Sequence, residues 1–414
     1  MSNSGNSSAP VVIIGGGLAG AKTAEQLREQ GYTGPVTLVS GEAAAPYERP
    51  PLSKEFLAGS KSLPDFTVHE AQWYAEHDVE LRQGVRAEAI DTEARTVRLD
   101  DGTGLDYSSL VLATGSTSVH PPIDGADADG VYYLRSIEDA TALRETFGEG
   151  KALAIIGGGW IGLEVAAGAR NAGTAVTVVE AADQPLQGPL GPEIGAAFAD
   201  LHRAHGVDLR TGRKVSAITT DGGQATGLTL DDGSTVPADA VLVAVGARPA
   251  IELATAAGLA TEAGGVRTDA SLRTSAPDVY AVGDIAAAEH PVLGTVVRTE
   301  HWANALNQPA VAAAGIVGTD SQYTRMPYFF TDQYDLGMEY RGDATGYSRV
   351  ITRGDVPGLN FLAFWVDDAG AVLAAMNVNI WDAGDDLSAL VAARKPVDAA
   401  ALADPDVALS SLLD

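Results

Sequence analysis

Two glycine-rich segments with the same spacing are the residues best suited to chemistry in this chain. Residues 15–20 and residues 157–162 both read G-x-G-x-x-G, and each follows a short apolar run that predicts a buried strand. The first glycine allows a tight turn, the second lets the backbone approach a pyrophosphate, and the third lets helix and strand pack closely. The phosphates bind amide hydrogens at the positive end of the following helix. Two such segments predict two bound dinucleotides, and a flavin with a nicotinamide is the economical pair.

A carboxylate after the second motif indicates which nicotinamide is used. Glu180 ends a predicted strand 23 residues after Gly157, where an acidic side chain accepts hydrogen bonds from the adenosine ribose hydroxyls. Residues 181–185 contain no arginine to hold a 2′-phosphate, so NADH is expected rather than NADPH. The corresponding position in the first motif is Ser40, with Glu42 two residues later. Either Glu42 or the serine with nearby backbone could bind the FAD ribose, and the sequence leaves both open.

Composition narrows the classes of partner and site. The chain has 55 acidic and 27 basic residues and a formal net charge of −28, which argues against nucleic acid and anionic membranes as partners. The acidity could be a solubility or salt adaptation of the host, or a docking face for a basic partner. There is no cysteine, and the seven histidines have no metal-ligand spacing, so no metal or redox-active dithiol is expected. Electrons accepted by a flavin must therefore leave to an acceptor outside this polypeptide.

The patterns around the motifs predict how these residues are positioned. Each motif lies in a strand–helix–strand unit followed by a hairpin and another buried strand, so the internal duplication covers whole domains. A short helix is expected near residues 52–57. The C-terminal part predicts an antiparallel sheet with one helix. The expected strands and helices are at 11–14, 18–30, 36–39, 89–99, 110–115, 153–156, 160–172, 176–179, 227–236, 240–246, 279–284, 348–352, 360–366, 371–378 and 387–393.

Four further motifs give the chain a family resemblance. They are Tyr47-Glu48-Arg49-Pro50-Pro51-Leu52-Ser53-Lys54, Tyr133-Leu134-Arg135, Ala281-Val282-Gly283-Asp284 and Glu300-His301-Trp302-Ala303-Asn304-Ala305. With them the chain resembles, over nearly its whole length, the FAD-dependent, NADH-linked ferredoxin reductases of bacterial monooxygenase and aromatic-dioxygenase systems. The resemblance implies an α/β fold like that of glutathione reductase, with two Rossmann-like dinucleotide-binding domains and a C-terminal α+β domain. The implied domains are FAD-binding at 1–115 and 246–320, NAD-binding at 116–245, and a C-terminal interface domain at 321–414.

The resemblance also implies the site residues. Lys54, near the flavin N5, and its partner Glu164 are the expected catalytic pair. The expected FAD contacts are Gly15, Gly17, Leu18, Ala19, Gly20, Arg49, Pro50, Lys54, Ala87, Ala113, Thr114, Gly115, Arg135, Gly283, Asp284 and Trp302. The expected NAD contacts are Gly157, Gly159, Trp160, Ile161, Gly162, Glu164, Glu180, Val245, Gly246 and Phe330.

Two positions depart from the family pattern. Members often carry P-W-x-W near the nicotinamide, where this chain has Pro327-Tyr328-Phe329-Phe330. The helix after Trp302 is rich in alanine, whereas related reductases have basic residues there that dock an acidic ferredoxin. The strength of aromatic stacking and the identity of the redox partner are therefore left open.

The expected activity is an FAD-dependent NADH:ferredoxin oxidoreductase. It would pass electrons from NADH through FAD to a small iron–sulfur ferredoxin that serves a cytochrome P450 or an aromatic-ring dioxygenase. The alternatives are an NADH oxidase or quinone reductase, a rubredoxin reductase, and an NADH-sensing flavoprotein like apoptosis-inducing factor. A cytoplasmic monomer or weak homodimer is expected.

Overall fold

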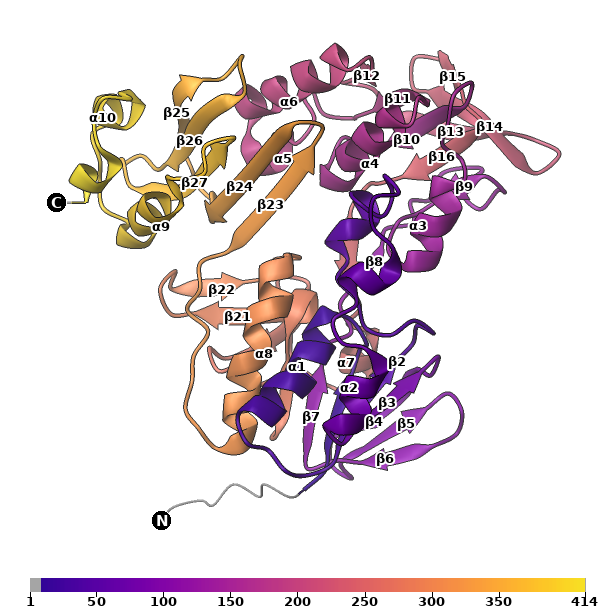
Figure 1. Cartoon of the computed structure of the whole chain (residues 1–414), viewed down its shortest axis with the longest axis vertical. Coiled ribbons are helices and arrows are strands. Elements are labelled where there is room, and N and C mark those ends of the chain that lie inside the picture. The colour runs from indigo at the N-terminus through magenta and orange to yellow at the C-terminus, as the bar shows by residue number, and fades with distance from the viewer. Residues whose placement is uncertain (1–8, 414) are drawn as a thin grey trace. The chain divides into compact units, whose positions relative to one another are not determined.

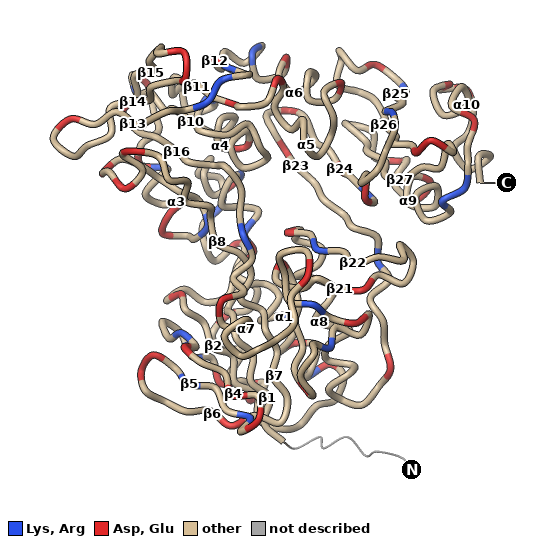
Figure 2. The backbone as a smooth tube through the Cα atoms, turned by 180° about the vertical axis from the view of Figure 1, so that it is seen from behind, with Lys and Arg blue, Asp and Glu red and all other residues tan. Residues whose placement is uncertain are grey.

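The computed structural model describes residues 9–413, which form two compact units (Figure 1). Unit 1 comprises residues 9–50, 62–117 and 247–325, and unit 2 comprises residues 51–61, 118–246 and 326–413. Asp and Glu residues occur along the backbone of both units (Figure 2). No helix among residues 9–413 is long and apolar enough to cross a bilayer.

Unit 1 is built on a five-stranded parallel sheet. Its order is β20 (Val279–Ala281), β7 (Ser109–Leu112), β1 (Val11–Ile14), β2 (Val36–Ser40) and β3 (Val79–Gln83). The central strand β1 is apolar at all four positions because both faces of the sheet are covered. On one face, α1 (Leu18–Glu29) packs beside α8 (Trp302–Val317), as Figure 1 shows.

The other face of this sheet packs against smaller elements of unit 1. They include the meander of β4 (Ala87–Asp91), β5 (Thr96–Leu99) and β6 (Gly104–Asp106), and the short helix α7 (Glu252–Ala256). A second sheet has the order β18 (Thr261–Glu262), β19 (Gly265–Thr268), β21 (Ala286–His290) and β22 (Thr295–Val297). The segment 89–99, expected as a single hairpin arm that ends at Asp101-Gly102, instead forms two paired strands, β4 and β5, and the expected turn joins β5 to β6.

Four strands of the unit 2 sheet repeat the order seen in unit 1, whereas its edge strand β9 (Val131–Tyr132) precedes the other four along the chain instead of following them. The parallel strands of this sheet are β9, β16 (Ala240–Val243), β10 (Ala152–Ile156), β11 (Ala175–Val179) and β12 (Asp208–Arg210). The helix α4 (Trp160–Asn171) connects β10 to β11, as α1 connects β1 to β2. The helices α3 (Ile137–Arg144), α5 (Gln187–Leu190) and α6 (Pro192–Ala204) and the meander β13 (Val215–Asp221), β14 (Gln224–Leu230) and β15 (Thr235–Pro237) complete this half.

The C-terminal part of unit 2 is an antiparallel sheet. Its order is β23 (Tyr328–Gln333), β24 (Leu336–Gly342), β27 (Val372–Val378), β26 (Asn360–Val366) and β25 (Arg349–Asp355), with α9 (Gly384–Ala393) and α10 (Ala399–Ala403). Alternate side chains of β26 enter two different cores: Trp365 packs with Phe198 of α6, and Phe364 packs with Leu387 of α9. The Trp365 indole also donates to the carbonyl of Leu190 at 3.1 Å. The sheet is therefore covered on both faces.

The fold class is confirmed, and several local expectations are wrong. The segment 52–57 is not a helix: a 3-10 turn at Pro50–Ser53 passes into further turns, because the amides of Lys54 and Phe56 share the carbonyl of Pro51. The strands expected at 110–115, 240–246 and 279–284 each end three residues early, at Leu112, Val243 and Ala281. The strands β23 and β24 were not predicted from the sequence.

Candidate active site and dinucleotide-binding sites

The first glycine loop, residues 15–20, joins β1 to α1 in unit 1. Gly15 has φ +122°, and a Cβ there would lie 2.1 Å from the carbonyl oxygen of Ala113. A Cβ on Gly20 would lie 1.9 Å from the carbonyl oxygen of Gly15. A Cβ on Gly17 would meet no described protein atom within 4 Å. The fold therefore requires the first and third glycines, but not the second.

The second glycine loop, residues 157–162, repeats this geometry in unit 2. Gly157 has φ +106° and would place a Cβ 2.4 Å from the carbonyl oxygen of Ala244. A Cβ on Gly162 would lie 2.2 Å from the carbonyl oxygen of Gly157, whereas a Cβ on Gly159 would be in open space. Gly17 and Gly159 are also the N-cap residues of α1 and α4, and neither supplies a side-chain cap. Both loops thus present helix amide groups beside a position without a side chain, which fits a phosphate.

The other residues expected to hold FAD in unit 1 follow neighbouring parallel strands. The segment Ala113–Gly115 follows β7, and Gly283 and Asp284 follow β20, so they lie at the same carboxyl edge of the sheet as the first glycine loop. Asp284 accepts a hydrogen bond from Ser116 at 3.1 Å. The hydroxyl of Thr114 donates to the carbonyl of Ala250.

Trp302 and Ala87 are placed by different contacts in unit 1. Trp302 begins α8, and its indole N–H donates to Glu48 at 2.8 Å. Ala87 begins β4, two residues after Val85, whose amide donates to the carbonyl of Ser40. Ala87 is thus linked to the end of β2 rather than to the glycine loop.

Arg49 is the main cation beside the first dinucleotide motif. Its guanidinium pairs with Glu42 at 2.5 Å, and Glu42 also accepts the Tyr47 hydroxyl. Burial by itself would lower the pKa of Arg49, but Tyr47, Glu42 and Asp284 together raise it above its ordinary value. The Arg49 guanidinium therefore stays charged. Its position is set by Glu42, the residue whose role in binding the FAD ribose the sequence left open.

Glu180 lies at the end of β11, against the second glycine loop. One carboxylate oxygen accepts the amide of Gly158 at 2.6 Å, and the other accepts the amide of Ala182 at 2.7 Å. The backbones of Arg210 and Arg213 bond to that of Glu180, and both side chains form ion pairs with acids: Arg210 with Asp208 at 2.9 Å and Arg213 with Asp232 at 3.0 Å. These two arginines beside Glu180 are therefore already engaged with carboxylates.

The expected catalytic pair forms in unit 2. Lys54 Nζ lies 2.6 Å from Glu164 Oε1, and both side chains are largely buried. The Ser53 hydroxyl donates to Glu164 Oε2 at 2.5 Å, and the Thr331 hydroxyl donates to Oε1 at 2.5 Å. Lys54 Nζ also lies 5.2 Å from the centre of the Phe330 ring, within cation–π distance. These four residues around Glu164, namely Ser53, Lys54, Phe330 and Thr331, are called the Glu164 cluster below.

Sequence reasoning found only part of this cluster. Lys54, Glu164 and Phe330 were expected, whereas Ser53 and Thr331 were missed. The adjacency of Ser53 to Lys54 was the one signal available for it. Nothing in the local pattern indicates Thr331, because its partner is 167 residues away.

The remaining residues expected to hold NAD lie at the carboxyl ends of β10 and β16 in unit 2. Ile161 and Val245 are large apolar residues that are 42% and 39% exposed. Trp160 packs on Phe329, with ring centres 4.5 Å apart, and Gly246 has φ +111°. This edge presents apolar surface to solvent, which suits a flat aromatic ligand.

Two of the residues expected to hold FAD, Lys54 and Arg135, belong to unit 2. Arg135 precedes α3, and its backbone amide donates to Asp139 beside the Ser136 cap.

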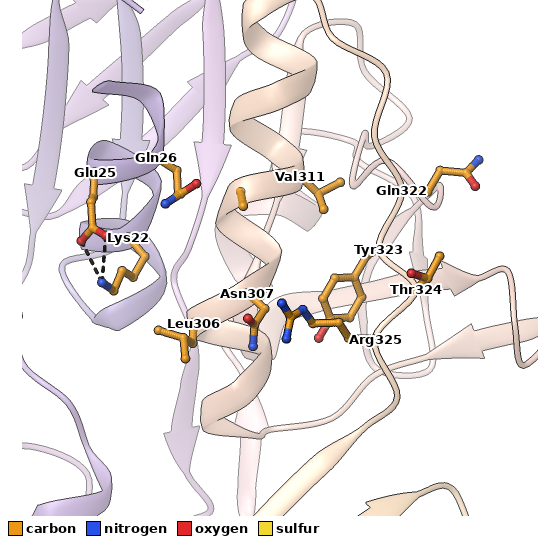
Figure 3. A pocket seen from close by; sticks show the side chains of 11 residues that line it. Lys22, Glu25, Gln26, Leu306, Asn307, Val311, Gln322, Tyr323, Thr324 and Arg325 are labelled. Carbon is orange, nitrogen blue, oxygen red and sulfur yellow. Dashed lines mark hydrogen bonds and ion pairs between the residues drawn. The ribbon is translucent and has the colours of Figure 1, made fainter. Parts of the chain in front are cut away.

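A separate pocket of about 360 Å³ lies in unit 1 between α1, α8 and residues 322–325 (Figure 3). Lys22 and Glu25 form an ion pair on one wall at 2.8 Å, and Arg325 lies on the other (Figure 3). None of the expected site residues lines this pocket.

Comparison with known proteins identifies the family. Residues 9–309 match the model of the pyridine nucleotide-disulphide oxidoreductases, and residues 328–413 match the reductase C-terminal model. The chain belongs to the pyridine nucleotide-disulphide oxidoreductase family. It is therefore an oxidoreductase, as the resemblance implied.

Individual relatives match over almost their whole length. The ferredoxin–NAD(+) reductase component of the anthranilate 1,2-dioxygenase system of Burkholderia cepacia is 40% identical over 409 residues, covering 98% of this chain and 99% of that relative. Putidaredoxin reductase of Pseudomonas putida is 36% identical, covering 99% and 97%. The crystal structure of the covalent putidaredoxin reductase–putidaredoxin complex matches with a TM-score of 0.94 and 35% identity, covering 98% of each chain.

Proposed function

We propose that this protein is a reductase that transfers electrons from NADH, through FAD, to a ferredoxin serving an oxygenase. The observation that carries the proposal is the pair of glycine loops together with the buried Lys54–Glu164 ion pair. In each loop the middle glycine, Gly17 or Gly159, is not required by the fold and stands at a helix N-terminus without a side-chain cap. Relatives named as ferredoxin–NAD(+) reductase components match over 97–99% of their length. The chain has no cysteine, so its electrons cannot pass to an internal dithiol.

We assign FAD to unit 1 through the first glycine loop. Its amides would bind the pyrophosphate, and Arg49 would supply positive charge near the phosphates. The Asp284 carboxylate would accept hydroxyls of the ribityl chain, and the Trp302 side chain is suited to packing beside the ring system. When bound, FAD accepts a hydride from NADH and can release two electrons one at a time.

We assign NAD to the second glycine loop and the exposed apolar edge of the same sheet. Glu180 would accept the ribose hydroxyls with the lone pairs that its two amide bonds leave free. The Glu180 carboxylate would repel the 2′-phosphate of NADPH, and the nearby Arg210 and Arg213 are engaged in ion pairs with other acids. NADH would therefore be preferred. Ile161, Val245 and Phe330 would supply apolar and aromatic contacts.

The Glu164 cluster would hold a cation at the reacting centre. Glu164 orients the Lys54 ammonium, and the hydroxyls of Ser53 and Thr331 fix the carboxylate from two sides. Lys54 is a compact cation suited to stabilising negative charge that develops on a reduced ring. Burial of the cluster excludes water, which strengthens this effect.

The domain division, assembly and location belong to the same proposal. We assign 1–115 and 246–320 to the FAD domain, 116–245 to the NAD domain and 321–414 to the C-terminal domain. Support comes from the two parallel sheets and the separate antiparallel sheet. We propose a monomer or weak homodimer that acts in the cytoplasm, where NADH is available.

Anaerobic stopped-flow spectroscopy tests the function. The purified protein should release FAD on denaturation, and NADH should reduce the flavin by two electrons and no further. Continued NADH oxidation should then require ferredoxin. Release of FMN, or no flavin, would contradict the cofactor assignment. Turnover with oxygen, menadione or rubredoxin that is faster than with any iron–sulfur ferredoxin would favour one of the alternative activities.

A further inference from the structure

A chain of buried hydrogen bonds extends from the Glu164 cluster to α6 within unit 2. Thr331 Oγ1 donates to Glu164 at 2.5 Å, and Gln333 Nε2 donates to Thr331 Oγ1 at 3.2 Å. Gln333 Oε1 lies 2.8 Å from Nε2 of His202. Thr331, Gln333 and His202 are each at most 1% exposed. The chain crosses from α4 through β23 to α6, three elements that no local sequence pattern connects.

The donors in this chain all point the same way. The Glu164 carboxylate accepts, so the Thr331 hydroxyl donates to it and uses its lone pair for the Gln333 amide. The amide oxygen of Gln333 therefore faces His202, and the imidazole must carry its hydrogen on Nε2. Nδ1 is left as an acceptor, with the Tyr334 hydroxyl 3.5 Å away. Burial lowers the pKa of His202 to about 4, so the ring is neutral at pH 7 and this single tautomer is expected.

We propose that Thr331, Gln333 and His202 form a one-directional donor chain that positions Glu164 and, through it, the catalytic Lys54. They are positioning residues, because only Thr331 touches the carboxylate and none touches Lys54. The proposal rests on the function proposed above for Lys54 and Glu164. Aligned hydrogen bonds in a buried setting polarise one another. Since each link is buried, breaking one leaves a polar group without its partner and frees the next link to move.

Other charged side chains near this chain of hydrogen bonds do not take the place of Thr331, Gln333 or His202. Glu55 and Asp332 are acidic neighbours of the pair, and burial raises the pKa of Asp332. His205 is close enough to His202 to lower its pKa further, and its ring stacks on Tyr334 with centres 3.7 Å apart, outside the hydrogen-bond chain. Among residues 9–413, Glu164 receives its side-chain hydrogen bonds from Ser53, Lys54 and Thr331 and from none of these three side chains.

The test is a double-mutant cycle measured on FAD-loaded protein. Thr331→Val removes the hydroxyl with little change of shape. Gln333→Leu removes the two hydrogen bonds that Gln333 makes, to Thr331 and to His202. Each should slow flavin reduction at saturating NADH by about two- to tenfold, the effect of one hydrogen bond, and change the NADH dissociation constant less than twofold. The double variant should be no slower than the Thr331→Val single variant. Thr331→Val already disconnects the hydrogen-bond chain from Glu164, so the loss of Gln333 has nothing further to remove. Thr331→Ser keeps the hydroxyl and should recover most of the rate.

A second measurement does not depend on activity. The ¹⁵N shifts of His202 in the oxidised protein, assigned with His202→Gln, should show the Nε2-protonated neutral ring in the wild type. An Nδ1-protonated ring would contradict the direction of the chain. Unchanged reduction rates in both single variants, with only a lower melting temperature, would overturn the positioning role. If NADH fails to reduce the wild-type flavin, the proposed function is wrong, whereas the NMR result still tests the hydrogen-bond chain.

Discussion

His202 should make unit 2 lose stability in mild acid. Burial lowers its pKa to about 4 from an ordinary value of 6.5, so between these values the unfolded chain binds a proton that the folded protein does not. Stability therefore falls as pH falls through 6.5 and stops falling below about 4. A difference of about 2.5 pKa units corresponds to about 3 kcal/mol in total. Between pH 7 and pH 5 the expected loss from this one group is about 2 kcal/mol.

Urea unfolding at several pH values measures this loss. We would compare the wild type with His202→Gln, which cannot take up the proton, following circular dichroism at pH 7, 6 and 5. The variant is expected to be less stable at pH 7 because it disturbs the bond to Gln333. Its stability should nevertheless fall by about 2 kcal/mol less than that of the wild type between pH 7 and 5. His205→Gln changes an exposed ring in the same region and should alter the pH dependence only slightly, because His205 is the smallest of the three influences on the pKa of His202. Equal slopes for wild type and His202→Gln would refute the reasoning.

Three further predictions concern the two dinucleotides and the partner. Gly17→Ala should weaken FAD binding but leave the melting temperature of the FAD-free protein unchanged. Gly15→Ala should destabilise the protein by about 1–3 kcal/mol. Equal losses of melting temperature in the two variants would contradict the conclusion that the fold requires Gly15 but not Gly17. Glu180→Ala should reduce the preference for NADH over NADPH by about 30- to 1,000-fold, or about 2–4 kcal/mol. Comparable wild-type rates of flavin reduction with the two cofactors would show that Glu180 does not discriminate between NADH and NADPH. Because α8 carries no lysine or arginine, ferredoxin reduction should change little as salt shortens the Debye length from about 30 to about 8 Å. A steep loss of rate would indicate a local basic patch, for which Lys22 and Arg325 beside α8 are the candidates.

Local patterns predicted the elements that carry the glycine loops. Apolar runs before residues 15 and 157 are buried on both sides of a parallel sheet, so composition alone marks them as strands. The hairpin at Asp232-Gly233 and the last three strands were predicted for the same kind of reason, because turn residues and alternation act over a few positions. The segment 52–57 was misjudged because two prolines and a shared carbonyl favour turns over a regular helix.

The amino-acid sequence by itself shows two G-x-G-x-x-G segments and no cysteine, and the family resemblance drew attention to Lys54 and Glu164. The motif already assigned different roles to its three glycines, but only the structure shows that a side chain at Gly15 or Gly157 would meet the carbonyl of Ala113 or Ala244, which lie about ninety residues away along the chain. Only the tertiary structure decided that Ser53, Thr331, Gln333 and His202 join Glu164 in one buried network. Hydrogen bonds form between side chains that packing brings within 3.5 Å, and no sequence spacing records that distance.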